Sequence, residues 1–241
     1  MKAIILAAGS GTRIASTALK PKALIEIGGI SLLGRQIDSL RRANVNDIVV
    51  VIGFQGDSIR REHPDGVQFV ENTKFAETSS LYSLWLAREH LTQGFVVLNS
   101  DVLFHPKLLA DLLNSPHENA LLISYCRDSK ERLGSEEMKI TVSDEVVVDI
   151  SKEIDPLAAD GENVGIVKFG PAGAKLLVPY MDDLIARGFV GAWAPRVFLE
   201  FARLHRLHAV STKGWPWIEI DFPEDYQKAI RDVFPRIELL S

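Results

Sequence analysis

Up to about residue 115, the chain alternates between short apolar runs and segments whose apolar side chains have helical spacing. Residues 3–8 are uninterruptedly apolar, which is typical of a strand buried on both faces. Apolar runs of this kind predict strands at 2–7, 47–53, 67–71 and 94–102. The segments between them predict helices at 31–43, 56–62 and 79–91. This alternation is typical of βαβ units.

The pattern changes in the second half of the chain. Strands are expected without helices between them, at 120–125, 138–143, 146–153 and 162–170. Helices at 172–187 and 194–204, strands at 207–211 and 217–220, and a helix begun by Pro223 complete the prediction. The expected fold is α/β, a Rossmann-like three-layer α/β/α arrangement with a central mixed, mostly parallel sheet. We expect one domain over 1–241, with a nucleotide-binding half (1–115) and an acceptor-binding half (116–241).

Net charge, cysteine content and the lengths of the apolar runs exclude several classes of protein. The net charge of the 241 residues is −5, and no basic footprint for nucleic acid is visible. Cys126 is the single cysteine, so an internal disulfide is excluded and a reducing compartment is favoured. No run of about 18 apolar residues predicts a membrane span. We therefore expect a cytoplasmic protein that binds neither nucleic acid nor membrane.

The first expected strand runs into a glycine-rich turn, "GSGTR", at residues 9–13. Gly9 and Gly11 allow the backbone to approach a ligand, and successive N–H groups in such a turn can bind an anion. Thr12 and Arg13 add donors suited to phosphate oxygens. The alternative is a tight structural turn with a surface arginine. A P-loop is excluded because Gly-Lys-Ser/Thr is missing, and a dinucleotide fingerprint is excluded because Ile14 replaces its third glycine.

The turn combines with a second motif. Together, "LAAGSGTR" (6–13) and "PKALIEIGG" (21–29) resemble the signature of the nucleotidyltransferases that make activated sugars and alcohols. "LNSDVLF" (98–104) and "WPWIEIDFPEDYQKA" (215–229) resemble the two metal-ligand segments of that family. "FAETSSLYSLWLA" (75–87) and "DGENVGIVKF" (160–169) are similar to the phosphocholine-type cytidylyltransferase branch. The sugar-activating branch usually has glycine-rich sequence where this chain has Thr78-Ser79-Ser80, and a glycine where it has Asn99-Ser100.

The resemblance implies a Mg²⁺-dependent transferase. It would move CMP from CTP to a small phosphorylated or phosphonylated acceptor, of the phosphocholine or 2-aminoethylphosphonate type, and release pyrophosphate. One alternative is a sugar-1-phosphate or inositol-phosphate nucleotidyltransferase that uses UTP, dTTP or CTP. A non-catalytic nucleotide-binding module is the alternative from another class. A homodimer stays open as an assembly.

The resemblance also assigns the nucleotide site. Arg13 and Lys22 are the expected catalytic cations, which neutralise the triphosphate and the charge that develops during transfer. Lys20 is interpreted as a solvated lysine. The expected nucleotide-binding residues are Leu6, Ala7, Ala8, Gly9, Ser10, Gly11, Thr12, Arg13, Lys22, Thr78, Ser79, Ser80 and Ser100.

Carboxylates mark the expected metal site. Asp101 ends a predicted strand, where ligands bind in open α/β sheets. Glu219 and Asp221 are two positions apart, so on a strand both would lie on one face. Mg²⁺ prefers such oxygen ligands. The alternatives are that Asp101 caps a turn and that Asp221 caps the helix at Pro223.

The acceptor site is predicted from aromatic and acidic residues. Tryptophan faces attract ammonium groups, and a carboxylate can pair with them. The expected acceptor-binding residues are Glu162, Trp193, Trp215 and Trp217. The alternatives are packing roles for each tryptophan and a solvated loop position for Glu162.

Overall fold

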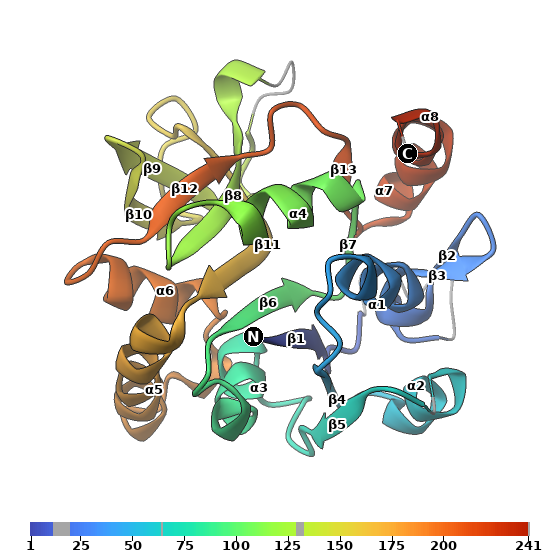
Figure 1. The fold of residues 1–241 in the computed structure, drawn as a ribbon, viewed down its shortest axis with the longest axis horizontal. Coiled ribbons are helices and arrows are strands. Elements are labelled where there is room, and N and C mark those ends of the chain that lie inside the picture. The colour runs from blue at the N-terminus through green and yellow to red at the C-terminus, as the bar shows by residue number, and fades with distance from the viewer. Residues whose placement is uncertain (12–19, 64, 129–132, 241) are drawn as a thin grey trace.

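The computed structural model describes residues 1–11, 20–63, 65–128 and 133–240 (Figure 1). Its centre is a nine-stranded sheet with the order β5-β4-β1-β6-β11-β8-β12-β10-β9. The sheet is continuous across the two halves of the chain, because β6 of the first half pairs with β11 of the second. The predicted α/β class with a mixed sheet is confirmed.

The first half forms the parallel part of the sheet. Its strands β1 (Lys2–Ala7), β4 (Ile48–Ile52), β5 (Gln68–Glu71) and β6 (Phe95–Asn99) pair in parallel. They are joined through α1 (Leu32–Arg42), α2 (Gly56–Glu62) and α3 (Ser80–Leu86). Because successive side chains of a strand point to opposite faces, β1 contributes Ile5 to one core and Ile4 to the other. The uninterrupted apolar run is therefore explained by burial on both faces.

The second half is largely antiparallel. Strand β11 (Gly161–Phe169) runs antiparallel to β6 and to β8 (Ala120–Tyr125), and only β12 (His208–Ser211) is parallel to its neighbour β8. Strands β10 (Val146–Ser151) and β9 (Lys139–Ser143) continue the sheet. Because β9 also pairs with β11, these five strands close into a ring. Closure removes the open edge that β9 would otherwise present.

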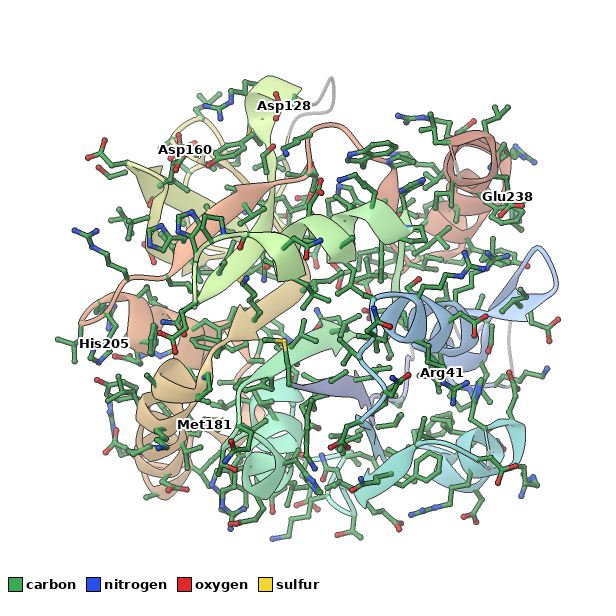
Figure 2. The ribbon with its side chains drawn as sticks, in the orientation of Figure 1. Arg41, Asp128, Asp160, Met181, His205 and Glu238 are labelled. Atoms are coloured by element: carbon green, nitrogen blue, oxygen red, sulfur yellow. The ribbon has the colours of Figure 1, made fainter. Side chains whose placement is uncertain are left out.

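Helices cover both faces of the sheet, as a three-layer arrangement requires. One core contains α3, α5 (Pro171–Ala186) and α6 (Pro195–Ala202), and the other contains α1, α2 and α4 (Pro106–Asn114). Met181, labelled in Figure 2, is a fully buried residue of α5 in the first of these cores.

A third core joins the segments that carry the predicted site. It packs β2 (Glu26–Ile27), which forms a hairpin with β3 (Ile30–Ser31), against β7 (Val102–Phe104) and β13 (Trp217–Glu219). The C-terminal helices α7 (Pro223–Lys228) and α8 (Phe234–Leu240), with a π-helical segment Ala229–Val233 between them, complete it (Figure 1). The segment after Lys22 and the segment before Asp221 are therefore held by the same apolar cluster.

Three expectations about elements are corrected. The predicted strand 94–102 is interrupted, because a turn at Ser100 and Asp101 separates β6 from β7. The predicted helix 79–91 ends as α3 at Leu86 and is followed by a short 3-10 turn, Arg88–His90. Helix α4 was not predicted. Among the described residues, no helix has both the length and the apolar character needed to cross a membrane.

Candidate active site

Three carboxylates from two distant parts of the chain converge where β6 and β13 end. Asp101 lies in the turn between β6 and β7, Glu219 ends β13, and Asp221 follows two residues later. One ligand oxygen from each of them lies within 4.8 Å of the others. The antiparallel pairing of β13 with β7, which places Glu219 opposite Val102, brings the two segments together. The structure thus assembles the predicted cluster.

Lys22 lies against this cluster. Its Nζ is 3.4 Å from Asp101 Oδ2 and also donates to Asp221 Oδ1. The lysine begins a 3-10 turn, Lys22–Leu24, that follows Pro21. Gly11 of the opening turn packs on its stem, because a Cβ on Gly11 would lie 2.6 Å from Lys22 Cγ. The glycine turn, the lysine and the carboxylates therefore form one site.

Burial and mutual repulsion dominate the electrostatics. Burial raises the pKa of Glu219 well above its usual value, and the charges of Asp101 and Asp221 raise it further. Burial also raises the pKa of Asp101, although Lys22 opposes this. For Lys22, burial acts to lower the pKa, but the charge of Asp101 and the bond to Asp221 outweigh it, so the pKa is raised. The cluster holds more negative charge than this lysine neutralises, and it therefore favours a further cation.

The donor set fits a magnesium ion. All three groups offer hard carboxylate oxygens, which Mg²⁺ prefers. Asp101 Oδ1 is buried and has no hydrogen-bond partner among the described residues. A buried oxygen of this kind needs a ligand, and a cation supplies one. Asp101, Glu219 and Asp221 are the residues that would hold the ion.

Hydrogen bonds from three elements fix the turn that carries Asp101. The buried Gln36 of α1 donates its Nε2 to the carbonyls of Asn99 and Val102, each at 2.9 Å. Ser100 N donates to Leu6 O at 3.3 Å, and Ile220 N donates to Asp101 O at 3.0 Å. The position of the carboxylate therefore depends on α1, β1 and the segment after β13.

The alternative role for Asp221 is settled by the start of α7. The N-cap of this helix is Phe222. The carboxylate that accepts at the helix start belongs to Asp225, which receives the N–H groups of Asp221 (3.0 Å) and Phe222 (2.7 Å). Asp225 thus takes the capping role, and the Asp221 carboxylate is directed to Lys22.

A cavity of about 450 Å³ extends from the carboxylates along the opening turn. Thr12 and Arg13 lie outside the described residues. The other predicted nucleotide-binding residues all line the cavity: Leu6, Ala7, Ala8, Gly9, Ser10, Gly11, Lys22, Thr78, Ser79, Ser80 and Ser100. At Gly9, an added Cβ would meet no atom of the described residues within 4 Å, so this position is open towards the cavity.

Sequence reasoning missed several residues that line this cavity. They include Asn72, Phe75, Glu136, Lys152 and Asn163. Asn72 organises the predicted base-proximal segment, because its Nδ2 donates to Thr78 Oγ1 (3.0 Å) and Ser83 Oγ (3.1 Å), and its Oδ1 accepts from Lys74 N (3.0 Å). The signal for Asn72 was its place directly after the predicted strand 67–71. No comparable signal marks Lys152.

The structure divides the predicted acceptor residues between two cavities. Trp193, half exposed, lines the first cavity. Glu162, Trp215 and Trp217 line a second cavity of about 670 Å³, which shares Glu219 and Asp221 with the first. The second cavity lies between the segment of Asp128 and the C-terminal helix that carries Glu238 (Figure 2). The packing alternative holds in part for Trp215, whose ring stacks on His105 at 4.5 Å.

Trp193 has charged neighbours inside the first cavity. Lys152 Nζ lies 4.7 Å from the centre of its ring and 3.5 Å from Glu136 Oε2. An aromatic face, a cation and a carboxylate therefore lie together in the lining of the cavity that also contains the carboxylate cluster. This arrangement can receive a small acceptor that carries both an anionic and a cationic group.

Comparison with known proteins places this site in a family. Residues 3–215 match the MobA-like NTP transferase domain. The chain is 31% identical over 234 residues to the choline-phosphate cytidylyltransferase of Streptococcus pneumoniae, which covers 95% of this chain and 96% of the relative. It is 23% identical over 255 residues to the CTP:phosphoglutamine cytidylyltransferase of Campylobacter jejuni, with 95% of this chain and 99% of the relative covered.

Solved structures give the same result for the fold. The CTP:phosphocholine cytidylyltransferase from Streptococcus pneumoniae superposes with a TM-score of 0.76 at 25% identity, over 100% of this chain and 99% of that one. The inositol-1-phosphate CTP transferase from T. maritima shares the fold, with a TM-score of 0.79 at 21% identity over 98% and 96% of the two chains. The chain therefore belongs to the MobA-like NTP transferase family, and it is an enzyme of the nucleotidyltransferase class.

Proposed function

We propose that the protein is a Mg²⁺-dependent cytidylyltransferase that moves CMP from CTP to a small phosphorylated or phosphonylated acceptor and releases pyrophosphate. The observation that carries the proposal is the convergence of Asp101, Glu219 and Asp221 on Lys22 beside the glycine turn. The choice of CTP is supported by relatives whose names specify cytidylyl transfer.

The reaction requires that the phosphate charges be neutralised and the reacting groups be aligned, and it does not require a general base. A phosphate monoester has its second pKa near about 6, so the attacking oxygen is already anionic at pH 7. That oxygen forms a bond to the α-phosphorus of CTP, and the bond from this phosphorus to the bridging oxygen of pyrophosphate breaks. Both electrons of the broken bond leave with pyrophosphate. The residues must hold the two phosphates in line and offset their charge.

Lys22 is the described cation best placed to meet the α-phosphate. Its Nζ already contacts two of the three carboxylates, and its stem packs against the glycine turn. The open position at Gly9 and the backbone of residues 9–11 would accept the triphosphate. When bound by the carboxylate cluster, Mg²⁺ would neutralise phosphate oxygens. Arg13 remains a predicted second cation.

The base would be read at the far end of the cavity. Ala8 and residues 78–80 of the expected base-proximal segment line the cavity. The hydroxyl of Thr78 is fixed by its bonds to Asn72 and to Lys74 O (2.8 Å), so the segment presents a defined surface. A site built from such polar groups rejects a base that leaves them unpaired.

The acceptor would lie between the metal cluster and Trp193. Lys152 would meet its phosphate or phosphonate, and the indole of Trp193 with Glu136 would meet its ammonium group. This chemistry fits phosphocholine and 2-aminoethylphosphonate. The second cavity, with Glu162, Trp215 and Trp217, borders the same carboxylates and offers an alternative place for the cationic end.

A panel of four nucleoside triphosphates against phosphocholine, 2-aminoethylphosphonate, inositol phosphate and sugar 1-phosphates tests the proposal. Pyrophosphate release is the readout. We expect CTP with one of the first two acceptors to be the best pair and to require Mg²⁺. Equal efficiency with UTP, or a preference for a sugar 1-phosphate, would contradict the proposal.

A further inference from the structure

The loop that carries Trp193 is attached to the segment assigned to the nucleotide. Trp193 lies between a 3-10 turn, Phe189–Gly191, and the start of α6 at Pro195. Ala194 N donates to Ser80 Oγ at 2.8 Å. In the opposite direction, Ser79 N donates to Val190 O at 2.9 Å and Leu81 N donates to Ala192 O at 3.2 Å. Three hydrogen bonds thus tie residues 190–194 to residues 79–81.

These hydrogen bonds give partners to polar groups of both the 190–194 loop and the start of α3. The first N–H groups of a helix have no acceptor within the helix. At the start of α3 the carbonyls of Val190 and Ala192 accept from the N–H groups of Ser79 and Leu81. The side chain of Ser79 makes no capping bond. The side chain of Ser80 does contact the loop, because its Oγ accepts from Ala194 N. The 190–194 loop therefore acts as the cap of α3, and Ser80 is the side chain that anchors it.

The bond to Ser80 is relevant to the first cavity because the loop carries Trp193. The indole of Trp193 is 50% exposed and lies at the wall of the first cavity. An exposed side chain on a short connection would lose conformational freedom when a ligand binds. The Ser80 bond holds the backbone of Ala194, the residue directly after Trp193, and so limits where the indole can lie.

We propose that Ser80 is a positioning residue for the acceptor, acting through the loop of Trp193, rather than a contact for the cytosine base. This inference rests on the proposed function, in which Trp193 receives the acceptor. The helix α3 would then link the two substrate subsites, because its start borders the base end of the cavity and also holds the acceptor wall.

Ser80→Ala is the test, with Ser39→Ala as the matched control. Ser39 is a buried serine of α1 whose Oγ donates to Arg35 O at 2.8 Å, so its variant loses one hydrogen bond away from both cavities. CTP affinity is measured by calorimetry without acceptor, and the acceptor KM is measured at saturating CTP with phosphocholine or 2-aminoethylphosphonate, whichever turns over faster. We expect Ser80→Ala to raise the acceptor KM about five- to tenfold, the effect of one hydrogen bond, and to leave the Kd of CTP unchanged.

Ser80→Thr keeps an oxygen at the same place, and we expect it to restore most of the acceptor affinity. A rise in the Kd of CTP with an unchanged acceptor KM would overturn the proposal, because Ser80 would then contact the nucleotide. Hydrogen exchange of residues 190–194 in the substrate-free protein gives a readout that is independent of catalysis. Faster exchange in Ser80→Ala but not in Ser39→Ala supports the anchor, even if the acceptor panel fails, and unchanged exchange overturns it.

Discussion

Gly9 and Gly11 lie two positions apart in the opening turn, yet their surroundings differ. Gly11 has φ +58 and would place a Cβ 2.6 Å from Lys22 Cγ, whereas a Cβ on Gly9 would meet no described atom within 4 Å. We expect Gly11→Ala to lower the free energy of unfolding by about 1 kcal/mol or more, because of its left-handed backbone and the clash. Gly9→Ala should change it by less than about 0.5 kcal/mol and should weaken CTP binding.

Urea denaturation and CTP titration of the two glycine variants check this contrast. A Gly9→Ala protein that binds CTP normally would show that the open position at Gly9 does not face the ligand. The glycine pattern "GSG" predicted a ligand turn, but it did not distinguish the two roles. That distinction needs the position of Lys22, which is close to Gly11 only in the folded chain.

Lys20 and Lys22 form a second contrast at the residue scale. Lys22 Nζ contacts Asp101 and Asp221, and its side chain is only 13% exposed. Lys20 is 59% exposed and pairs with Glu26 at 3.4 Å, a surface ion pair of small energetic effect. We expect Lys22→Ala to reduce kcat by about 10²–10³, the usual effect of removing one preorganised electrostatic contact. Lys20→Ala should keep kcat near that of the unchanged protein.

Steady-state pyrophosphate release with CTP measures both lysine variants, and circular dichroism checks that they fold. Near-normal turnover of Lys22→Ala would remove Lys22 from the mechanism. The motif "LKPKAL" predicted which lysine is functional only through its resemblance to a family signature. The physical reason, a position between two partly buried carboxylates, follows from the β13–β7 pairing and could not be obtained from spacing along the chain.

At the scale of elements, the connection from β5 to α3 depends on Asn72. This residue is 1% exposed and bonds to Lys74, Thr78 and Ser83. We expect Asn72→Ala to lower the free energy of unfolding by about 1–3 kcal/mol, because it leaves buried polar groups unpaired. Hydrogen exchange should also become faster in residues 73–80, several of which line the first cavity.

Thr73→Ala, an exposed change in the same connection, is the control for Asn72→Ala, and urea denaturation gives the free energies. If the two variants were equally stable, the segment would be held by backbone bonds alone. Asn72 was not selected from the sequence because an asparagine after a strand is also typical of an ordinary turn. Its function as an organiser appears only when the three partners are seen around one side chain.

Most strands and helices followed from the hydrophobic pattern, and the interruption of the predicted strand 94–102 has a tertiary cause. The run "GFVVLNSDV" is mostly apolar and continues past Asn99 and Ser100 to Val102, so it predicts one strand over 94–102. In the structure Gln36 bonds to the carbonyls of Asn99 and Val102, and β7 leaves the central sheet to pair with β13. A tertiary contact thus breaks the strand. The break is what places Asp101 at the site.

At the scale of the whole molecule, the sequence predicted that Asp101, Glu219 and Asp221 meet, but it did not predict that the expected acceptor residues line two different cavities. Asp101, Glu219 and Asp221 each follow or end a strand, and strand ends meet at one edge of the site. Trp193, Trp215 and Trp217 were grouped by residue type. In the structure Trp193 lines the first cavity, whereas Trp215 and Trp217 line the second, and no local pattern along the chain predicts that division.

The carboxylate cluster couples metal binding to the stability of the whole fold. Asp101 directly precedes β7, and Glu219 and Asp221 end or follow β13; the third core joins these two strands to the C-terminal helices. Without a metal ion the like charges of Asp101, Glu219 and Asp221 oppose folding, and Lys22 offsets them only in part. We therefore expect Asp101→Asn and Asp221→Asn to abolish Mg²⁺-dependent turnover while leaving the thermal midpoint in EDTA equal or higher.

Magnesium should raise the thermal midpoint of the unchanged protein. An ion that binds only the folded state raises the midpoint by mass action, so the midpoint should rise with Mg²⁺ concentration. The two variants should lose this dependence, whereas Asp47→Asn, which alters a surface carboxylate 3.2 Å from Lys2, should keep it. Calorimetric scans with EDTA and with increasing Mg²⁺ measure all four proteins. A midpoint of Asp101→Asn that still rose with Mg²⁺ as in the unchanged protein would show that the ion binds elsewhere, and the assignment of the cluster as the metal site would fail.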